Sequence, residues 1–107
     1  MNELIEKILT LNIFDKRVVS EDYDEVVIFN NQIDHINSIL QDYFGEPVKA
    51  AGAKPTKDDL RATSDFGGLW MDQTLYKKQQ QDITEIAMLW PWQDSVHTTL
   101  KIARIKK

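Results

Sequence analysis

The stretch that decides the fold is residues 83–90, which have the sequence ITEIAMLW. In a β-strand, successive side chains point to opposite faces of the sheet. One face would carry Ile86, Met88 and Trp90, and the other Ala87 and Leu89. An apolar pattern on both faces is typical of a strand that has protein on both sides. We therefore expect residues 69–105 to form a small antiparallel sheet with this strand in its middle.

Two further strands are expected beside it. Residues 69–78 alternate between the two faces, and residues 96–106 alternate more strictly, with Val96, Thr98, Leu100 and Ile102 on one side. Short connections at 79–82 and 92–95 join the three strands into a meander. Pro91 has no N–H to donate to a ladder, so pairing should stop near Trp90 on at least one side.

The first 44 residues indicate helices. Apolar residues recur at helical spacing in 2–12, which predicts a short first helix. From Val26 to Tyr43 one apolar stripe keeps a spacing of three and four, which favours a single helix over 21–44. Residues 26–29 are strand formers, however, so a strand at 24–29 followed by a helix at 31–44 is the alternative.

The middle of the chain is an irregular crossover, because its glycines and most of its prolines fall there. Thr56 and Asp59 have the spacing of a capping box, which predicts a helix of about two turns ending near Thr63. Residues 47–51 are a candidate fourth strand. The expected fold is one α+β domain of two layers, in which N-terminal helices pack on a three- or four-stranded antiparallel meander. Its parts are a helical half at 1–45, the crossover at 46–68 and the sheet at 69–106.

The second apolar face of the middle strand needs a cover, because large exposed apolar patches are unusual on a monomer. The helices cover one face only. Three covers are open for the other face: the crossover 47–66 folding back, a second copy of the chain in a homodimer, or a bound ligand or protein partner.

Composition narrows the class of protein. The chain has 107 residues, a net charge of −4 and no cysteine, which is ordinary globular composition. The bases lie mainly toward the C-terminus, but their excess is small, so nucleic-acid binding is not expected. No apolar run is long enough to span a membrane, and residues 1–7 carry acids where a signal peptide carries bases. We therefore expect a cytoplasmic protein.

The candidate site lies around the end of the middle strand. Tryptophan supplies a large contact area with few torsions to order, and it is enriched at binding hot spots. An aspartate three residues before a histidine can orient the imidazole. The candidate ligand- or partner-binding residues are Trp70, Met88, Trp90, Trp92, Asp94 and His97. The alternative is that the tryptophans are core residues packed on the helices and that His97 is an exposed strand residue.

The sequence predicts no catalytic residues, cofactor or metal. Two histidines without cysteine do not make a zinc site, and no glycine-rich phosphate loop occurs. The leading hypothesis is a non-enzymatic binding or regulatory module that associates with itself or with a protein partner through a tryptophan-bearing sheet face. The alternative hypothesis is a small-molecule pocket walled by Trp70, Trp90 and Trp92, with Asp94 and His97 at its rim.

Overall fold

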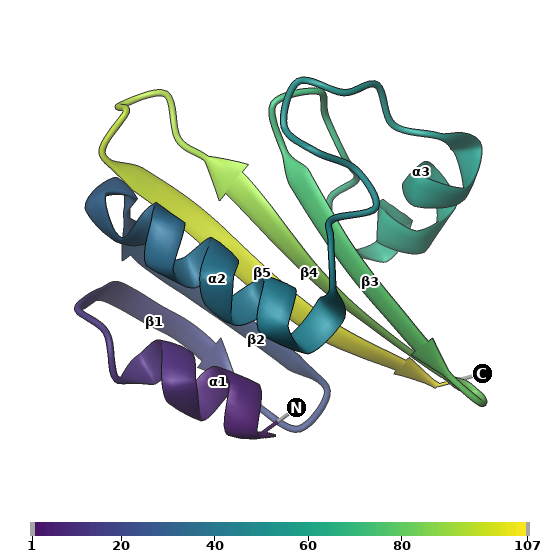
Figure 1. Ribbon diagram of the computed structural model, residues 1–107, viewed down its shortest axis with the longest axis horizontal. Coiled ribbons are helices and arrows are strands. Elements are labelled where there is room, and N and C mark those ends of the chain that lie inside the picture. The colour runs from purple at the N-terminus through teal and green to yellow at the C-terminus, as the bar shows by residue number, and fades with distance from the viewer. Residues whose placement is uncertain (1, 107) are drawn as a thin grey trace.

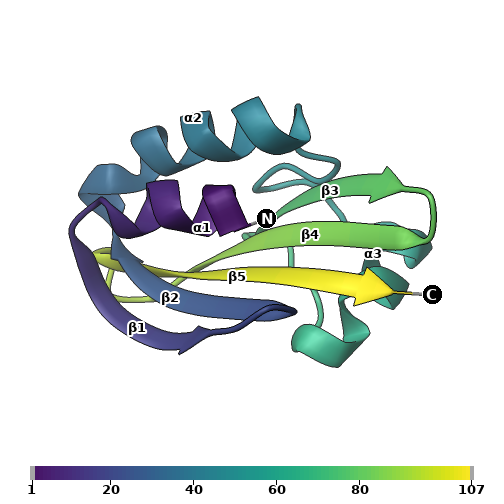
Figure 2. The same ribbon diagram turned by 90° about the horizontal axis from the view of Figure 1, so that it is seen from below.

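The computed structural model describes residues 2–106 and contains helices on both sides of one sheet (Figures 1 and 2). The helices are α1 (Asn2–Leu9), α2 (Ile33–Phe44) and α3 (Lys57–Thr63), with 3-10 turns η1 (Asn30–Gln32) and η2 (Ser64–Phe66). The strands are β1 (Ile13–Val19), β2 (Tyr23–Phe29), β3 (Thr74–Gln80), β4 (Ile83–Pro91) and β5 (His97–Lys106).

The five strands form one antiparallel sheet in the order β1-β2-β5-β4-β3. The predicted α+β class and the antiparallel meander of the last three strands are confirmed. The first of these strands begins at Thr74 rather than at residue 69. Trp70 to Gln73 instead form a turn, closed by the Gln73 N–H on the Trp70 carbonyl and the Trp70 N–H on the Gln73 side chain.

The prediction of one helix over 21–44 is wrong, and the alternative is close to what is observed. Residues 13–29 form the hairpin β1-β2, and α2 begins only at Ile33. In β2, Val26, Val27 and Ile28 are all fully buried. Val26 and Ile28 belong to the core under the helices, and Val27 alternates to the other side of a strand that is flanked by β1 and β5. Pairing with β5 along the whole of β2 thus overrides a helical pattern that was already weakened by strand-forming residues.

One face of the sheet is covered by α1 and α2, which lie side by side above it in Figure 2. Their apolar stripes meet residues from β2, β3, β4 and β5. The fully buried side chains of this core include Ile8, Ile36, Leu40, Val26, Ile28, Leu100 and Ile102. The predicted inward face of the last strand, from Thr98 to Ile102, is the face observed.

The opposite face of the sheet, called the second face below, is covered over only part of its area. Figure 2 shows α3 below the sheet, near β3 and β4, and away from β1. The expected two-layer arrangement is therefore incomplete, because the crossover forms a partial third layer. It closes over a compact apolar cluster of Leu69, Leu75, Ile86, Met88 and Ala103. Of the three covers considered, the returning crossover is the one observed over this cluster.

Within the crossover, the predicted short helix and its capping box are present. The Asp59 N–H donates to the Thr56 hydroxyl and the Thr56 N–H donates to the Asp59 carboxylate. Residues 47–51 do not form a strand and make one isolated bridge, between Lys49 and Leu75. The extra strands of the sheet are β1 and β2 instead.

No helix among residues 2–106 has the length and hydrophobicity needed to cross a membrane.

Candidate functional site

The second face of the sheet divides into two halves. We call the part under the crossover, with the apolar cluster around Met88, the covered half. We call the part over β1, β2 and the adjoining ends of β4 and β5 the open half. The side chains that define the open half are Phe14, Asp15, Arg17, Tyr23, Glu25, Phe29, Trp92, His97, Thr99 and Lys101.

Strand β1 reaches the open half through two irregularities in its pairing with β2. The register steps from Ile13 directly to Asp15 and from Lys16 directly to Val18, so each step leaves one extra residue in β1. The extra residues are Phe14 and Arg17. A β-bulge re-aims a side chain and raises local twist, and bulges are common beside binding sites. Here both extra side chains are directed onto the second face.

Phe14 completes a cluster of rings that we call the aromatic corner, made of Phe14, Phe29, Trp92 and His97. The His97 ring lies 4.2 Å from the Phe14 ring, 5.0 Å from the Trp92 ring and 5.5 Å from the Phe29 ring, measured between centroids. Phe14 meets Phe29 and Trp92 edge-on. Such edge-to-face pairs are favourable beyond their buried area. Phe14 nevertheless remains 51% exposed.

The Asp94 carboxylate orders the turn that presents His97. One of its oxygens accepts from the backbone N–H groups of Val96 and His97, and the other lies 2.6 Å from His97 Nδ1. The hydrogen bond to His97, followed by those from the backbone, lowers the pKa of Asp94 to about 2. The carboxylate therefore stays ionised and fixes the orientation of the imidazole by its Nδ1 atom.

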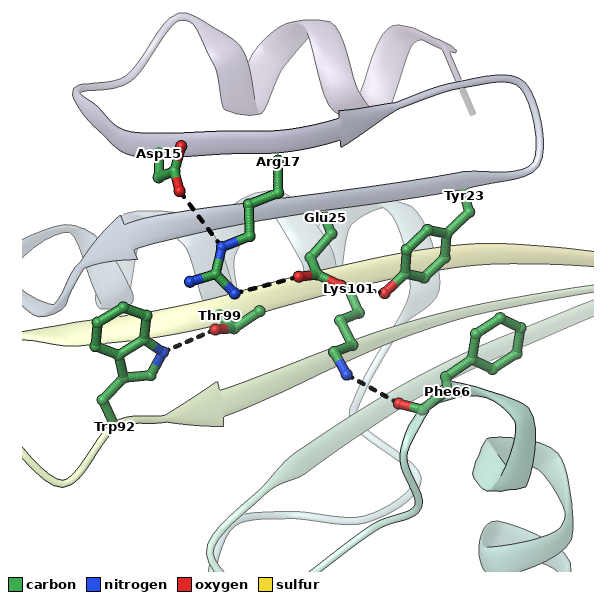
Figure 3. Close-up of polar contacts among 8 residues, drawn as sticks. All are labelled: Asp15, Arg17, Tyr23, Glu25, Phe66, Trp92, Thr99 and Lys101. Atoms are coloured by element: carbon green, nitrogen blue, oxygen red, sulfur yellow. Dashed lines mark hydrogen bonds and ion pairs between the residues drawn. The ribbon is translucent and has the colours of Figure 1, made fainter.

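Beside the aromatic corner lies a chain of polar contacts (Figure 3). Arg17 donates to Asp15 and to Glu25, each at 3.4 Å, and its guanidinium lies 5.7 Å from the centre of the Trp92 ring. The Tyr23 hydroxyl donates to Glu25 at 2.6 Å. This hydrogen bond is the main cause that lowers the pKa of Glu25, whereas burial is the main cause that raises the pKa of Tyr23.

Trp92 adjoins this network through the Arg17 guanidinium, and its indole nitrogen donates to the Thr99 hydroxyl at 2.8 Å. The ring is partly buried, with one end in the aromatic corner and its polar atom satisfied. An aromatic side chain fixed in this way has little rotamer entropy left to lose when another group packs against it.

Lys101 and Trp90 mark the border between the two halves. The Lys101 ammonium lies 3.4 Å from the centre of the Trp90 ring and donates to the Phe66 carbonyl in the crossover at 2.9 Å. Burial lowers the pKa of Lys101. Gly67, at a φ of +99°, passes so close that a Cβ there would lie 2.3 Å from the Trp90 ring. Glycine at this position lets the crossover close onto the tryptophan.

The structure separates the residues that the sequence singled out. Trp92, Asp94 and His97 come together at the end of β4 and the start of β5, and Trp90 lies at the adjacent border. Met88 is fully buried in the covered half. Trp70 lies in the loop before β3 and is 66% exposed.

Phe14, Arg17 and Phe29 were not among the residues predicted from the sequence. The alternation of Tyr23, Glu25, Val27 and Phe29 was an available clue to the face on which Phe29 lies, once 24–29 is taken as a strand. No sequence pattern marks the bulges that direct Phe14 and Arg17, because a bulge is defined by the partner strand as much as by its own residues.

Among residues 2–106, no group of three or more histidine and carboxylate side chains is placed to hold a metal ion. No known protein family, curated protein or solved structure matches the chain. A functional proposal for this protein therefore rests on the geometry of its structure.

Proposed function

We propose that this protein is a non-enzymatic recognition module that binds a segment of another protein at the aromatic corner. The observation that carries the proposal is the pair of bulges in β1. A seven-residue edge strand departs twice from regular pairing, and both departures bring a large side chain, Phe14 or Arg17, to Trp92. In a regularly paired β1, each residue would oppose one residue of β2, and neither Phe14 nor Arg17 would be an extra residue in the strand.

The residue types of the open half support protein recognition. Tryptophan, tyrosine and arginine are the types most enriched at binding hot spots. Here Arg17 and Tyr23 both donate to Glu25, and the Arg17 guanidinium lies over the Trp92 ring. Exposed apolar side chains lie around them, with Phe14 and Val18 on β1 and Val96 in the β4–β5 turn. An apolar anchor of the partner would pack on Phe14 and Trp92, with polar contacts around it.

A second copy of the chain is a poorer occupant than a different protein. The bulges disrupt the outer edge of β1, and bulged edges resist pairing with another strand. The net charge of −4 also opposes the approach of an identical chain. We therefore assign the partner as heterologous and as docking on the sheet face rather than extending the sheet.

The experiment is selection of a displayed peptide library on the immobilised protein. Peptides that bind are then measured against Phe14→Ala and Arg17→Gln, with Trp70→Ala as the matched control for loss of an exposed aromatic ring. Phe14→Ala is expected to weaken binding by tenfold or more, and Trp70→Ala by less than about twofold. Urea unfolding of each variant verifies that the fold is retained.

Two results would overturn the proposal. One is that selected peptides bind the Phe14 and Trp70 variants equally. The other is that sedimentation velocity shows a stable dimer of the wild-type chain that Phe14→Ala dissociates, because the aromatic corner would then be a contact between copies.

A further inference from the structure

A cavity lies on the helix side of the sheet, opposite the aromatic corner. Its volume is about 270 Å³, close to the lower limit of small-molecule sites in proteins. Its wall comes from the start of α2, the facing ends of β3, β4 and β5, and the loops around the crossover. The lining residues are Asn30, Ile33, Asn37, Ala51, Asp72, Thr74, Leu89, Pro91 and Thr98.

The cavity and the aromatic corner share the same strand ends. Asn30 follows Phe29, Pro91 precedes Trp92, and Thr98 follows His97. Because successive strand residues face opposite sides, one member of each pair lines the cavity and the other belongs to the corner. The same strand ends therefore carry the residues of the aromatic corner on one face and the residues of the cavity on the other.

Two carboxamides in the wall are held in a definite orientation. The Thr98 hydroxyl donates to Asn30 Oδ1 at 2.6 Å, and the Tyr76 hydroxyl donates to Asn37 Oδ1 at 2.7 Å. Burial raises the pKa of Tyr76, so this hydroxyl keeps the proton that it donates. With both amide oxygens engaged, the NH₂ groups of Asn30 and Asn37 are the donors left for a ligand.

Asp72 is the one carboxylate among the lining residues of the cavity. It is an exposed residue of the turn before β3. Burial lowers the pKa of Lys49, and the negative charge of Asp72 partly offsets that lowering. The Lys49 ammonium is fixed nearby by the carbonyls of Trp70, Met71 and Gln73. A cationic ligand at Asp72 would be repelled by the Lys49 ammonium. An uncharged ligand therefore fits the cavity better.

We propose that the cavity binds a small, planar, uncharged molecule that presents an imide edge, with one N–H donor between two carbonyl acceptors, as uracil and cyclic imides do. The Asn30 and Asn37 amides donate to the carbonyl groups and the Asp72 carboxylate accepts from the N–H. Ile33, Leu89 and Pro91 provide the apolar surface for the ring. The site is independent of the proposed recognition function, since none of its lining residues belongs to the aromatic corner.

The test uses the full chain, labelled with ¹⁵N, and titrations with uracil and with succinimide followed by NMR. Saturable shifts of the Asn30 and Asn37 side-chain NH₂ resonances are expected with at least one of the two probes. The matched probe 1,3-dimethyluracil lacks the N–H and is expected to bind at least fivefold more weakly than uracil.

Variants locate the binding. Asp72→Asn is expected to weaken binding of the probe about tenfold, since the N–H would then donate to a neutral amide oxygen instead of a charged carboxylate. Asp82→Asn, in the exposed β3–β4 turn, is the matched control and should leave affinity unchanged. Phe14→Ala should also leave it unchanged, which separates this site from the recognition surface.

The proposal is overturned if neither probe shifts the two NH₂ resonances at about 10 mM, a concentration that would largely fill a millimolar site. It is equally overturned if dimethyluracil binds as well as uracil, or if Asp72→Asn and Asp82→Asn have the same effect.

Discussion

The covered and open halves of the second sheet face use the same strands but complete their surfaces in different ways. In the covered half, Ile86 and Met88 meet Leu69 of the crossover, and all three are buried. In the open half, the corresponding face carries Glu25 and Thr99, whose polar atoms are paired with neighbours. The apolar side chains of the covered half are buried by a protein cover, whereas Glu25 is paired by hydrogen bonds and remains partly exposed. Thr99 is itself buried and accepts from the Trp92 indole.

The side chains at the border between the halves contact residues of both. Tyr23 stacks on Phe66 of the crossover and donates to Glu25 of the open half. Lys101 contacts the Trp90 ring and the Phe66 carbonyl. Substitutions across this border should therefore differ in their cost to stability, and that cost should decrease from the covered half to the corner.

The largest effect is expected from Met88→Ala in the covered half. Removing a fully buried methionine leaves a cavity and should lower the free energy of unfolding by about 2–5 kcal/mol. Met71→Ala is the control at an exposed position and should cost less than about 0.5 kcal/mol. Urea unfolding measures both, and equal costs would contradict the assignment of Met88 to a closed core.

A somewhat smaller loss is expected from Gly67→Ala at the border. Its positive φ is unfavourable for alanine, and the new Cβ would meet the Trp90 ring, so we expect a loss of about 2–4 kcal/mol. Gly52→Ala shares the positive φ but has open space around it, and it should cost about 1–2 kcal/mol. Thermal or urea unfolding gives the difference, which measures how closely the crossover packs on Trp90. Identical losses would mean that this packing is loose.

Tyr23→Phe should have a modest effect that depends on pH. It keeps the stacking on Phe66 but removes the hydrogen bond to Glu25, at a cost of about 1 kcal/mol near neutral pH. Since this bond lowers the folded-state pKa of Glu25, its stabilisation is present above the ordinary carboxyl pKa and is lost as the pH falls through the folded pKa. Unfolding free energies of both proteins between pH 7 and acid should therefore converge, and a constant difference would contradict this account.

The smallest effect on the fold is expected from His97→Ala in the aromatic corner. Its hydrogen bond is the main cause that holds the pKa of Asp94 at about 2, so the variant should titrate closer to the ordinary aspartate value of 3.8. Carboxyl ¹³C chemical shifts measure this directly. His35→Ala, at an exposed position in α2, is the control and should leave the Asp94 pKa unchanged. An unchanged pKa in His97→Ala would mean that the pair is not formed in solution.

The candidate site was predictable only where its residues are close in sequence. Trp92, Asp94 and His97 lie within six positions and were singled out together, because a tight connection keeps them adjacent whatever the rest of the chain does. Phe14 and Arg17 come from a strand that sequence analysis did not identify. Trp70 was grouped with the other tryptophans by residue type, but the turn at 70–73 places it in an exposed loop instead.

By itself, the sequence determined that residues 83–90 form a strand with two apolar faces, because the alternation of side chains in a strand is a local property. A strand with two apolar faces needs a protein cover on each face, and this inference from the sequence is confirmed. Only the tertiary structure decided that the crossover provides the cover for Met88, and that 24–29 joins the sheet beside β5 instead of extending a helix. Both outcomes depend on which distant segments pair and bury each other, and such contacts leave no periodicity in the segments themselves.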